Sequence, residues 1–207
     1  MMNNRKGTVF VVSGPSGTGK GTIMQEYFKR YPEDNSFLSV SATTRNPRPT
    51  DTDGVTYYFK TREEFESLIA NDGLAEWTEF CGNYYGTPKK PVNDMIEKGN
   101  NVILEIEVDG AGQVKNSFED AVGIFVLPPS FAELRKRLTD RNTESAEVIE
   151  SRLKRAYEEI KEIDKYDYIL INDVLDEAVE NFRSIIIGES QRVKRNKNII
   201  NEVCKKC

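Results

Sequence analysis

The chain has 207 residues, enough for one domain with a substantial hydrophobic core. Its net charge of −5, from 34 acidic and 29 basic residues, argues against nucleic acid as the main partner, because nucleic-acid-binding domains are usually basic. The absence of histidine excludes histidine triads, histidine general bases and histidine zinc sites, and three cysteines are too few for a disulfide framework. The sequence also lacks a membrane-span pattern and a signal-peptide pattern, so we expect a cytoplasmic protein.

The first informative segment is a glycine-rich loop that follows a short apolar run. Residues 8–12 predict a buried strand, and a helical pattern continues from residue 23 to about Tyr31. Strand, glycine-rich loop and helix in this order predict a P-loop, in which backbone N–H groups and a helix N-terminus bind nucleotide phosphates. The alternative is an ordinary glycine-rich turn. The predicted ATP-binding residues of the loop are Gly14, Pro15, Ser16, Gly17, Thr18, Gly19, Lys20, Gly21 and Thr22.

Two side chains of this loop carry its expected chemistry. Lys20 supplies a mobile positive charge for the outer phosphates. The hydroxyl that usually follows the lysine directly comes one position later, at Thr22. Three roles therefore remain open for Thr22: direct contact with Mg²⁺, contact through water, or a bond to a phosphate alone.

The middle third of the chain, about 41–90, has a different character. We expect a second core strand just before it at 37–40, then a polar loop over 42–54 and a strand over 55–59. The segment from Thr61 to Glu64 predicts a capping box that starts a helix. A short antiparallel pair is expected over 74–80 and 83–85, and a helix over 91–98. Short strands and turns of this kind predict an inserted lobe of mixed β structure.

Strands and helices alternate again in the last half. We expect strands over 102–107, 121–126 and 168–171, and helices from a second capping box at Ser130 to about 141, over 147–163 and over 177–195. This alternation predicts an α/β fold with a mostly parallel sheet flanked by helices. The expected single domain consists of a core (about 7–40 and 100–195), the lobe (41–90), a small helical lid (137–152) and a basic tail (196–207).

Two carboxylates end the strand predicted over 102–107. Glu105 and Glu107 alternate with Ile106, so their side chains are expected to share one face of the sheet. Carboxylates at the end of a buried strand near a P-loop suit contacts with substrate or with metal-bound water. The alternative is a pair of solvated strand ends.

Several motifs together indicate the substrate. The pattern Ser-x-Thr-Thr-Arg-x-Pro-Arg over 41–48 resembles guanylate kinases, which phosphorylate GMP with ATP. The resemblance continues over 54–59, 76–87, 104–110, 128–130, 137–141 and 171–173, and it spans roughly residues 8–190. It implies a P-loop NTPase-type core, an inserted GMP-binding lobe, a helical lid, and Mg²⁺ as the cofactor that accompanies ATP.

The resemblance assigns a GMP phosphate site to the lobe. Arg45 and Arg48 would hold the phosphate by paired N–H···O bonds, and the Tyr57 and Tyr85 hydroxyls would donate to the same group. The alternatives are solvated loop cations and half-buried packing tyrosines.

Glu76 is the residue that would select the base. A carboxylate accepts hydrogen bonds from both guanine donors, N1–H and the N2 amine, whereas adenine presents an acceptor at N1. The alternative is a surface carboxylate beside Trp77. The family pattern adds further GMP-binding residues: Ser41, Thr87, Glu105 and Glu107.

The lid and the end of the last strand complete the predicted site. Arg137, Arg141 and Arg152 match mobile lid arginines that neutralise charge on the transferring phosphoryl group, with Lys20 and Arg45 as the other catalytic residues. For Arg152 the alternative is a salt bridge on the helix surface. Asn172 matches a position near the adenine of ATP.

We therefore predict an enzyme that converts ATP and GMP, and dGMP as well, to diphosphates in purine nucleotide metabolism. The alternatives are a kinase of another nucleoside monophosphate and a guanylate-kinase-like protein-binding module; the intact loop around Lys20 argues against the module. No nucleic-acid or membrane partner is expected, and the protein is predicted to be a monomer or a homodimer. The tail, with Cys204 and Cys207, is interpreted as a solvated terminus.

Overall fold

The central element of the computed structural model, which describes residues 6–140, 145–197 and 203–204, is a five-stranded sheet. Every pair of neighbouring strands in it is parallel, in the order β2-β7-β1-β8-β9. The strands are β1 (Val9–Ser13), β2 (Ser36–Leu38), β7 (Asn101–Glu105), β8 (Val122–Leu127) and β9 (Tyr168–Ile171). Because β1 lies in the middle, the glycine-rich loop begins at the centre of the edge where the parallel strands end.

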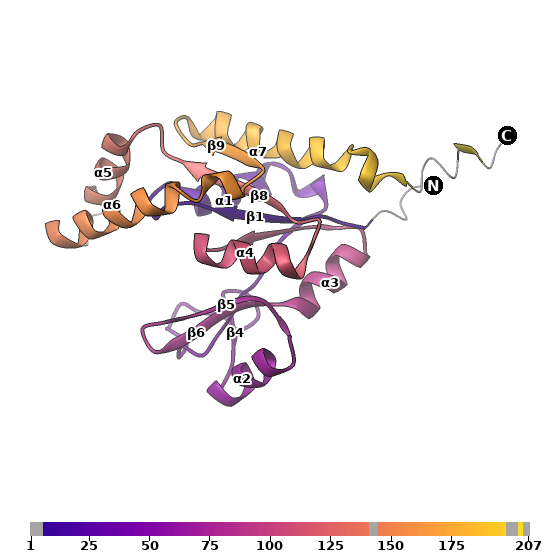
Figure 1. The fold of residues 1–207 in the computed structure, drawn as a ribbon, viewed down its shortest axis with the longest axis horizontal. Coiled ribbons are helices and arrows are strands. Elements are labelled where there is room, and N and C mark those ends of the chain that lie inside the picture. Colours follow the sequence, from indigo (N-terminus) through magenta and orange to yellow (C-terminus); the bar gives the residue numbers. More distant parts are fainter. Residues whose placement is uncertain (1–5, 141–144, 198–202, 205–207) are drawn as a thin grey trace.

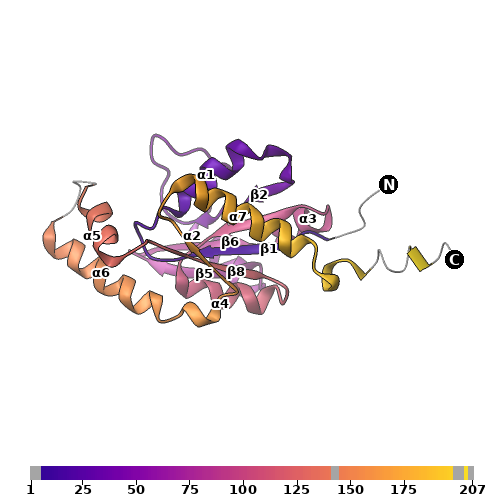
Figure 2. The same ribbon diagram turned by 90° about the horizontal axis from the view of Figure 1, so that it is seen from above.

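Helices cover both faces of this sheet (Figures 1 and 2). On one face, Phe10 and Val12 of β1 pack with α1 (Lys20–Arg30) and α7 (Leu175–Ser190). On the other face, Val9 and Val11 pack with α3 (Lys89–Glu97) and α4 (Val108–Ser117). Alternate residues of one strand thus enter two separate hydrophobic clusters, which is what the pleat of a doubly covered strand requires. The fold class predicted from the sequence is confirmed.

A second sheet forms the lobe below the core in Figure 1. Its order is β4-β3-β6-β5, with β3 parallel to β4 and the other pairs antiparallel. The strands are β3 (Ala42–Thr43), β4 (Tyr58–Phe59), β5 (Leu74–Phe80) and β6 (Asn83–Pro88). Helix α2 (Arg62–Ala70) packs Phe65 against Ala42 and Leu74. The predicted mixed β lobe is therefore present.

Two local expectations in the lobe are wrong. The predicted loop over 42–54 begins with a strand, β3, because Ala42 is buried in the lobe core. The predicted strand over 55–59 is mostly a turn. Gly54 adopts φ +74°, and the Thr56 hydroxyl donates to the carbonyl oxygen of Thr52, so only Tyr58 and Phe59 join the sheet.

The two predicted capping boxes differ in outcome. At α2, the Thr61 side chain accepts from the Glu64 backbone and the Glu64 carboxylate accepts from the Thr61 backbone, so the box is complete. At α5 (Phe131–Thr139), the Ser130 hydroxyl accepts from the Glu133 backbone, but the Glu133 carboxylate binds Arg137 instead. Helix α5 and the long helix α6 (Ala146–Ile160) pack through Leu134, Leu138, Ile149 and Leu153.

Helix α4 has no counterpart among the predicted elements, although Val108, Ala111 and Val114 bury one side of it. Helices α6 and α7 end earlier than expected, and single 3₁₀ turns follow them at Ile163–Lys165 and Val193–Arg195; a third such turn lies at Pro32–Asp34.

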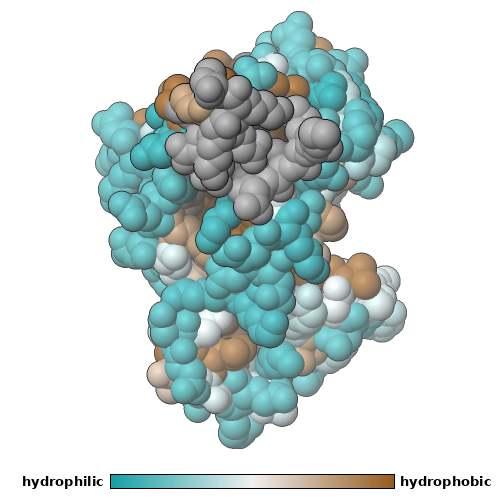
Figure 3. All heavy atoms as spheres, turned by 90° about the vertical axis from the view of Figure 1, so that its right-hand side faces the viewer, coloured by the Kyte–Doolittle hydropathy of each residue, from teal (hydrophilic) through white to brown (hydrophobic). Residues whose placement is uncertain are grey.

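The surface viewed from the right of Figure 1 is mostly hydrophilic over both core and lobe (Figure 3). Among the residues that the structure describes, no helix is long and apolar enough to cross a bilayer. Cys204 is exposed, and Cys207 lies outside the described residues.

Candidate active site

The glycine-rich loop starts where β1 ends and depends on two glycines at its flanks. Gly14 has φ +143°, and a Cβ there would lie 2.3 Å from the carbonyl oxygen of Val126 in β8. Gly19 has φ +88°, and a Cβ there would lie 2.3 Å from Nδ2 of Asn172. Side chains at these positions would push the loop away from the sheet or from Asn172. Glycine therefore allows the backbone to turn tightly between β1 and the N-terminus of α1.

Lys20 is the first residue of α1, and its ammonium group lies across the loop. Its Nζ donates to the carbonyl oxygens of Gly14 at 2.6 Å and Pro15 at 3.2 Å. The Thr18 hydroxyl also donates to the Pro15 oxygen, at 2.9 Å. Thr22 lies exposed in the first turn of the same helix. The positive charge of Lys20 and the hydroxyl group of Thr22 thus both lie in the first turn of α1, at the helix N-terminus, where anions are stabilised.

Asn172 joins the loop to helix α5. It follows β9, is buried, and donates from Nδ2 to the Thr18 carbonyl oxygen at 2.8 Å. Its own carbonyl oxygen accepts from Nη2 of Arg137 at 3.0 Å, while Nε of Arg137 contacts Glu133 at 2.9 Å. Two predicted residues from distant parts of the sequence, Asn172 and Arg137, therefore lie side by side next to the loop.

Helix α6 contacts the loop from a second direction. Nη1 of Arg152 donates to the Ser16 hydroxyl at 3.2 Å, so Arg152 is more than a surface salt-bridge partner. An exposed ion pair between Arg135 and Glu150 also links α5 to α6. The third predicted lid residue, Arg141, lies outside the described residues.

Carboxylates near Lys20 form the acidic side of the site. Glu105 ends β7, and a Cβ on Gly21 would lie 3.7 Å from both of its carboxylate oxygens. Loss of solvation raises the pKa of Glu105, and the positive charge of Lys20 lowers it in part. Burial likewise raises the pKa of Glu159 in α6, while Arg155 and Lys20 oppose that shift. The positive charge of Lys20 therefore lowers the pKa of carboxylates from two different elements, β7 and α6.

Glu107 does not share a strand face with Glu105, and this expectation is wrong. Strand β7 ends at Glu105, and Glu107 is the residue before the first turn of α4. Its carboxylate pairs with Arg155 on α6, and 67 % of its side chain is exposed. The turn into α4 thus directs Glu107 to helix α6.

The lobe gathers the residues predicted to bind the acceptor phosphate. The guanidinium carbon of Arg45 lies 5.5 Å from the centroid of the Tyr57 ring, and the Tyr57 and Tyr85 rings lie 6.2 Å apart. Nη2 of Arg45 donates to Oδ2 of Asp51 at 2.8 Å. The same oxygen accepts the Arg48 backbone N–H at 2.7 Å, whereas the Arg48 side chain is exposed. The hydrogen bond from the Arg48 backbone, together with Arg45, lowers the pKa of Asp51.

Glu76 is buried on β5, with 7 % of the residue exposed, so it is not a surface carboxylate. Its Oε1 accepts from the Thr87 hydroxyl across the β5–β6 pair at 2.7 Å. Burial raises the pKa of Glu76, and the hydrogen bond from Thr87 opposes the shift. The other oxygen, Oε2, lies close to Gly110 of α4, where an added Cβ would stand 3.0 Å away. Ser41 lies just before β3 and is half-buried.

Helix α4 attaches this part of the lobe to the core. The Gln113 side chain accepts from the Trp77 backbone N–H at 3.2 Å and donates to the Trp77 carbonyl oxygen at 3.1 Å. The Ser117 hydroxyl donates to the carbonyl oxygen of Ala75 at 3.0 Å. The backbone on both sides of Glu76 is therefore fixed by a helix that belongs to the core.

Sequence reasoning missed three contributors to the site: Asp51, Gly110 and Arg155. The spacing of Asp51 three residues after Arg48, in a loop rich in proline, is typical of a turn carboxylate and could have drawn attention to it. The apolar spacing at 108, 111 and 114 could have placed Gly110 on a helix. The partners of Arg155 come from distant elements, so no local pattern indicated them.

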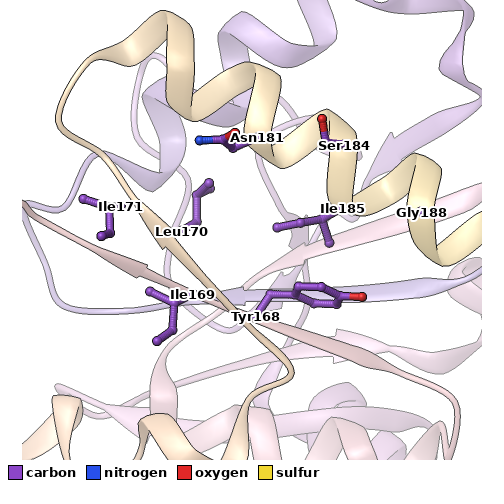
Figure 4. A pocket seen from close by; sticks show the side chains of 8 residues that line it. All are labelled: Tyr168, Ile169, Leu170, Ile171, Asn181, Ser184, Ile185 and Gly188. Atoms are coloured by element: carbon purple, nitrogen blue, oxygen red, sulfur yellow. The ribbon is translucent and has the colours of Figure 1, made fainter.

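A separate groove of about 490 Å³ lies between β9 and α7, and none of the site residues described above lines it (Figure 4). Ile169, Ile171 and Ile185 line it together with Tyr168, whose hydroxyl donates to Glu189. The groove contains neither the loop nor the arginines of the lobe. The candidate active site consists instead of the glycine-rich loop with Lys20, at the ends of the parallel strands, together with the charged residues of the lobe.

Comparison with known proteins identifies similar chains throughout this length. The family model for guanylate kinases matches residues 6–189. A guanylate kinase of Desulfitobacterium hafniense (strain Y51) is 52 % identical over 194 residues, covering 94 % of this chain and 96 % of its own length. One of Caldanaerobacter subterraneus is 49 % identical over 199 residues, covering 96 % of both chains.

A solved structure agrees with these sequence relatives. The crystal structure of guanylate kinase from Anaplasma phagocytophilum superimposes with a TM-score of 0.71 at 34 % sequence identity. The match covers 94 % of this chain and 92 % of the other.

Proposed function

The chain belongs to the guanylate kinase family, and from that premise we propose how its residues divide the work of transferring the γ-phosphoryl group of ATP to GMP. The products are ADP and GDP. The observation that supports this assignment of roles is that the structure contains two regions suited to anions, and that they differ in construction. One is a backbone loop with Lys20. The other lies in the lobe, which carries Arg45 and, on β5, the buried carboxylate of Glu76.

ATP binds at the loop in this proposal. Backbone N–H groups of 14–19 and the N-terminus of α1 surround its phosphates, and Lys20 leaves the loop carbonyls to follow the outer phosphates. Asn172, fixed on the Thr18 carbonyl oxygen, lies next to the loop on the side proposed for the adenine. The proposed ATP-binding residues are Gly14, Pro15, Ser16, Gly17, Thr18, Gly19, Lys20, Gly21, Thr22 and Asn172.

GMP binds in the lobe. The Arg45 and Arg48 guanidinium groups and the Tyr57 and Tyr85 hydroxyls receive its phosphate. Glu76 accepts the guanine N1–H and N2 amine, while its Oε1 also accepts from the Thr87 hydroxyl. Ser41, Glu105 and Glu107 complete the proposed set, with Glu107 reaching the substrate only if its pairing with Arg155 changes.

Transfer requires the two sites to come together while water is excluded. A GMP phosphate oxygen attacks the γ-phosphorus in line, and Lys20, Arg137 and Arg152 neutralise the charge that develops. Arg141 is proposed for the same role from its place in the sequence. Since α5 carries Arg137, α6 carries Arg152 and the two helices pack on each other, we propose that the helices move as one unit when the lid opens or closes.

The oxygen donors around the loop fit a divalent ion. Thr22 offers a hydroxyl in the first turn of α1, and Glu105 offers a carboxylate beside Gly21. The described residues hold no group of three or more His, Cys, Asp or Glu arranged to bind a metal, so phosphate oxygens of ATP would supply further ligands. Mg²⁺, the ion we propose, would neutralise phosphate charge when bound. We also propose a cytoplasmic location and a role in purine nucleotide metabolism.

One coupled assay tests the proposal. The purified protein is given ATP and Mg²⁺ with GMP, dGMP, AMP, CMP or UMP, and ADP release is followed. GMP should be strongly preferred among the four ribonucleotides, and EDTA should abolish the reaction. Equal turnover of AMP would favour a kinase of another nucleoside monophosphate, and no turnover with binding intact would favour a protein-binding module.

A further inference from the structure

Asp51 lies between the two arginines of the lobe and has no place in the roles assigned above. Its Oδ2 accepts from Nη2 of Arg45 at 2.8 Å and from the backbone N–H of Arg48 at 2.7 Å. The backbone N–H of Asp51 in turn donates to the Arg48 carbonyl oxygen at 2.9 Å. A single carboxylate oxygen therefore links the side chain of one arginine to the backbone of the other.

These contacts fix Arg45 without using up its donors. A guanidinium has five N–H groups. Asp51 accepts one of those of Arg45, and Nη1 donates another to the Asn46 carbonyl oxygen at 2.9 Å. The remaining N–H groups are available for a phosphate. The Tyr57 and Phe59 rings lie 5.5 and 5.8 Å from the guanidinium carbon and limit its movement in other directions.

The ion pair is also shielded. The Arg45 side chain is 16 % exposed and that of Asp51 is 9 % exposed, in contrast to the exposed side chain of Arg48. Shielded pairs with good geometry hold their members in place far better than the solvated pairs on the surface. The pKa of Asp51 is lowered by these partners, so the carboxylate remains ionised at neutral pH.

We propose that Asp51 is a positioning residue for the acceptor nucleotide: it holds the Arg45 guanidinium and the Arg48 backbone in the arrangement that receives the phosphate of GMP. The proposal rests on the assignment of GMP to the lobe. Two effects of the carboxylate oppose each other, since its negative charge repels a phosphate while its hydrogen bonds preorganise the arginines. Because the pair is shielded and Arg45 is otherwise a long flexible side chain, preorganisation is expected to dominate.

The test compares two isosteric substitutions in one loop. Asp51→Asn removes the charge between the arginines, and an amide nitrogen in place of Oδ2 would face the Arg45 donors. Asp53→Asn is the matched control, because Oδ1 of Asp53 accepts the Phe59 backbone N–H at 2.9 Å. Calorimetry measures the Kd of GMP and of guanosine, which lacks the phosphate, and steady-state assays give kcat and KM.

For Asp51→Asn we expect the Kd and KM of GMP to rise about tenfold, the usual effect of losing a hydrogen bond to a charged group. The affinity for guanosine should stay unchanged, and kcat should fall less than KM rises. Asp53→Asn should leave GMP binding within about twofold of wild type. In an Arg45→Ala background, Asp51→Asn should weaken GMP binding less than it does in the wild type, because Asp51 acts largely through Arg45.

Unchanged or tighter GMP binding in Asp51→Asn would overturn the positioning role and show that repulsion dominates. An equal loss for GMP and guanosine would overturn it in favour of general distortion of the lobe. A wild-type protein that binds neither ligand would instead overturn the proposed function, so the two failures are distinguishable.

Discussion

The loop at the end of β1 and the lobe, the two places proposed to bind phosphate, are built by different means. The loop is shaped by backbone: glycines with positive φ, carbonyl oxygens that receive Lys20, and a buried amide at Asn172. The lobe is shaped by pairs of side chains, Arg45 with Asp51 and Glu76 with Thr87. The difference predicts that substitutions in the loop mainly change the rate of transfer, while those in the lobe mainly change the affinity and choice of acceptor.

The largest effect is expected at Lys20, the charged group of the loop. Lys20→Ala should lower kcat about 100- to 1000-fold, because stabilisation of developing charge is lost. The Kd of GMP should change little, since GMP is assigned to the lobe. Steady-state kinetics and GMP calorimetry on the folded variant measure both quantities. A near-normal kcat would remove Lys20 from the catalytic set.

Arg137 tests the contact between the loop and the lid. Arg137→Ala should lower kcat about tenfold or more and also raise the KM of ATP, because the carbonyl oxygen of Asn172 loses its partner. GMP affinity should be nearly unchanged. A large loss of GMP affinity with normal kcat would place Arg137 at the acceptor site and blur the division between the two regions.

Alanine substitutions at two glycines of α4, Gly110 and Gly112, provide a test and its control for the position of Glu76 in the lobe. A Cβ on Gly110 would stand 3.0 Å from Oε2 of Glu76, whereas one on Gly112 would meet nothing within 4 Å. Alanine at Gly112 should stabilise the helix by about 1 kcal/mol and leave the kinetics unchanged. Gly110→Ala should raise the KM of GMP a few-fold by displacing Glu76. Equal kinetics for both variants would show that Glu76 has room to move.

The smallest expected effect concerns stability. Burial raises the pKa of Glu76, so its carboxyl group contributes most to stability below its unfolded-state pKa, and that contribution is lost as pH rises through the folded-state pKa. Ionising Glu76 in the ligand-free protein therefore costs stability, because the carboxylate is buried. Glu76→Gln should raise the Tm at pH 7 by about 2–4 °C, the shift that 1 kcal/mol produces in a chain of this size. A lower Tm would contradict this reading of the buried carboxylate.

Much of this comparison could be predicted from sequence because the signals are local. The loop was identified by glycine spacing between an apolar run and a helix, and the core strands were identified by apolar runs that alternate with helical patterns along the chain. Helix α4 was missed because Gly110 and Gly112 give it low intrinsic propensity, and packing of Val108, Ala111 and Val114 holds it in place. The burial of Glu76 and its neighbour Gly110 depends on tertiary packing, which no short pattern specifies.

The prediction of a strand over 55–59 was wrong because of a local turn rather than because of tertiary packing. Its residues have high β propensity, but the glycine at 54 and the threonine pair at 52 and 56 form a turn that competes with the sheet. The prediction that Glu107 shares a strand face with Glu105 was wrong because β7 ends at Glu105. Glu107 lies in the turn before α4, where the alternation of side chains along a strand no longer applies.

The most direct test of the account is the ratio of kcat/KM for GMP to kcat/KM for IMP, which lacks the N2 amine, in the wild type and in Glu76→Gln. An amide keeps one acceptor but turns an NH₂ toward the guanine donors. The wild type should prefer GMP, and the variant should lose about one to two decades in kcat/KM for GMP and much less for IMP. The ratio should therefore collapse. An unchanged ratio would show that Glu76 does not read the N2 amine and would contradict the assignment of guanine to the lobe.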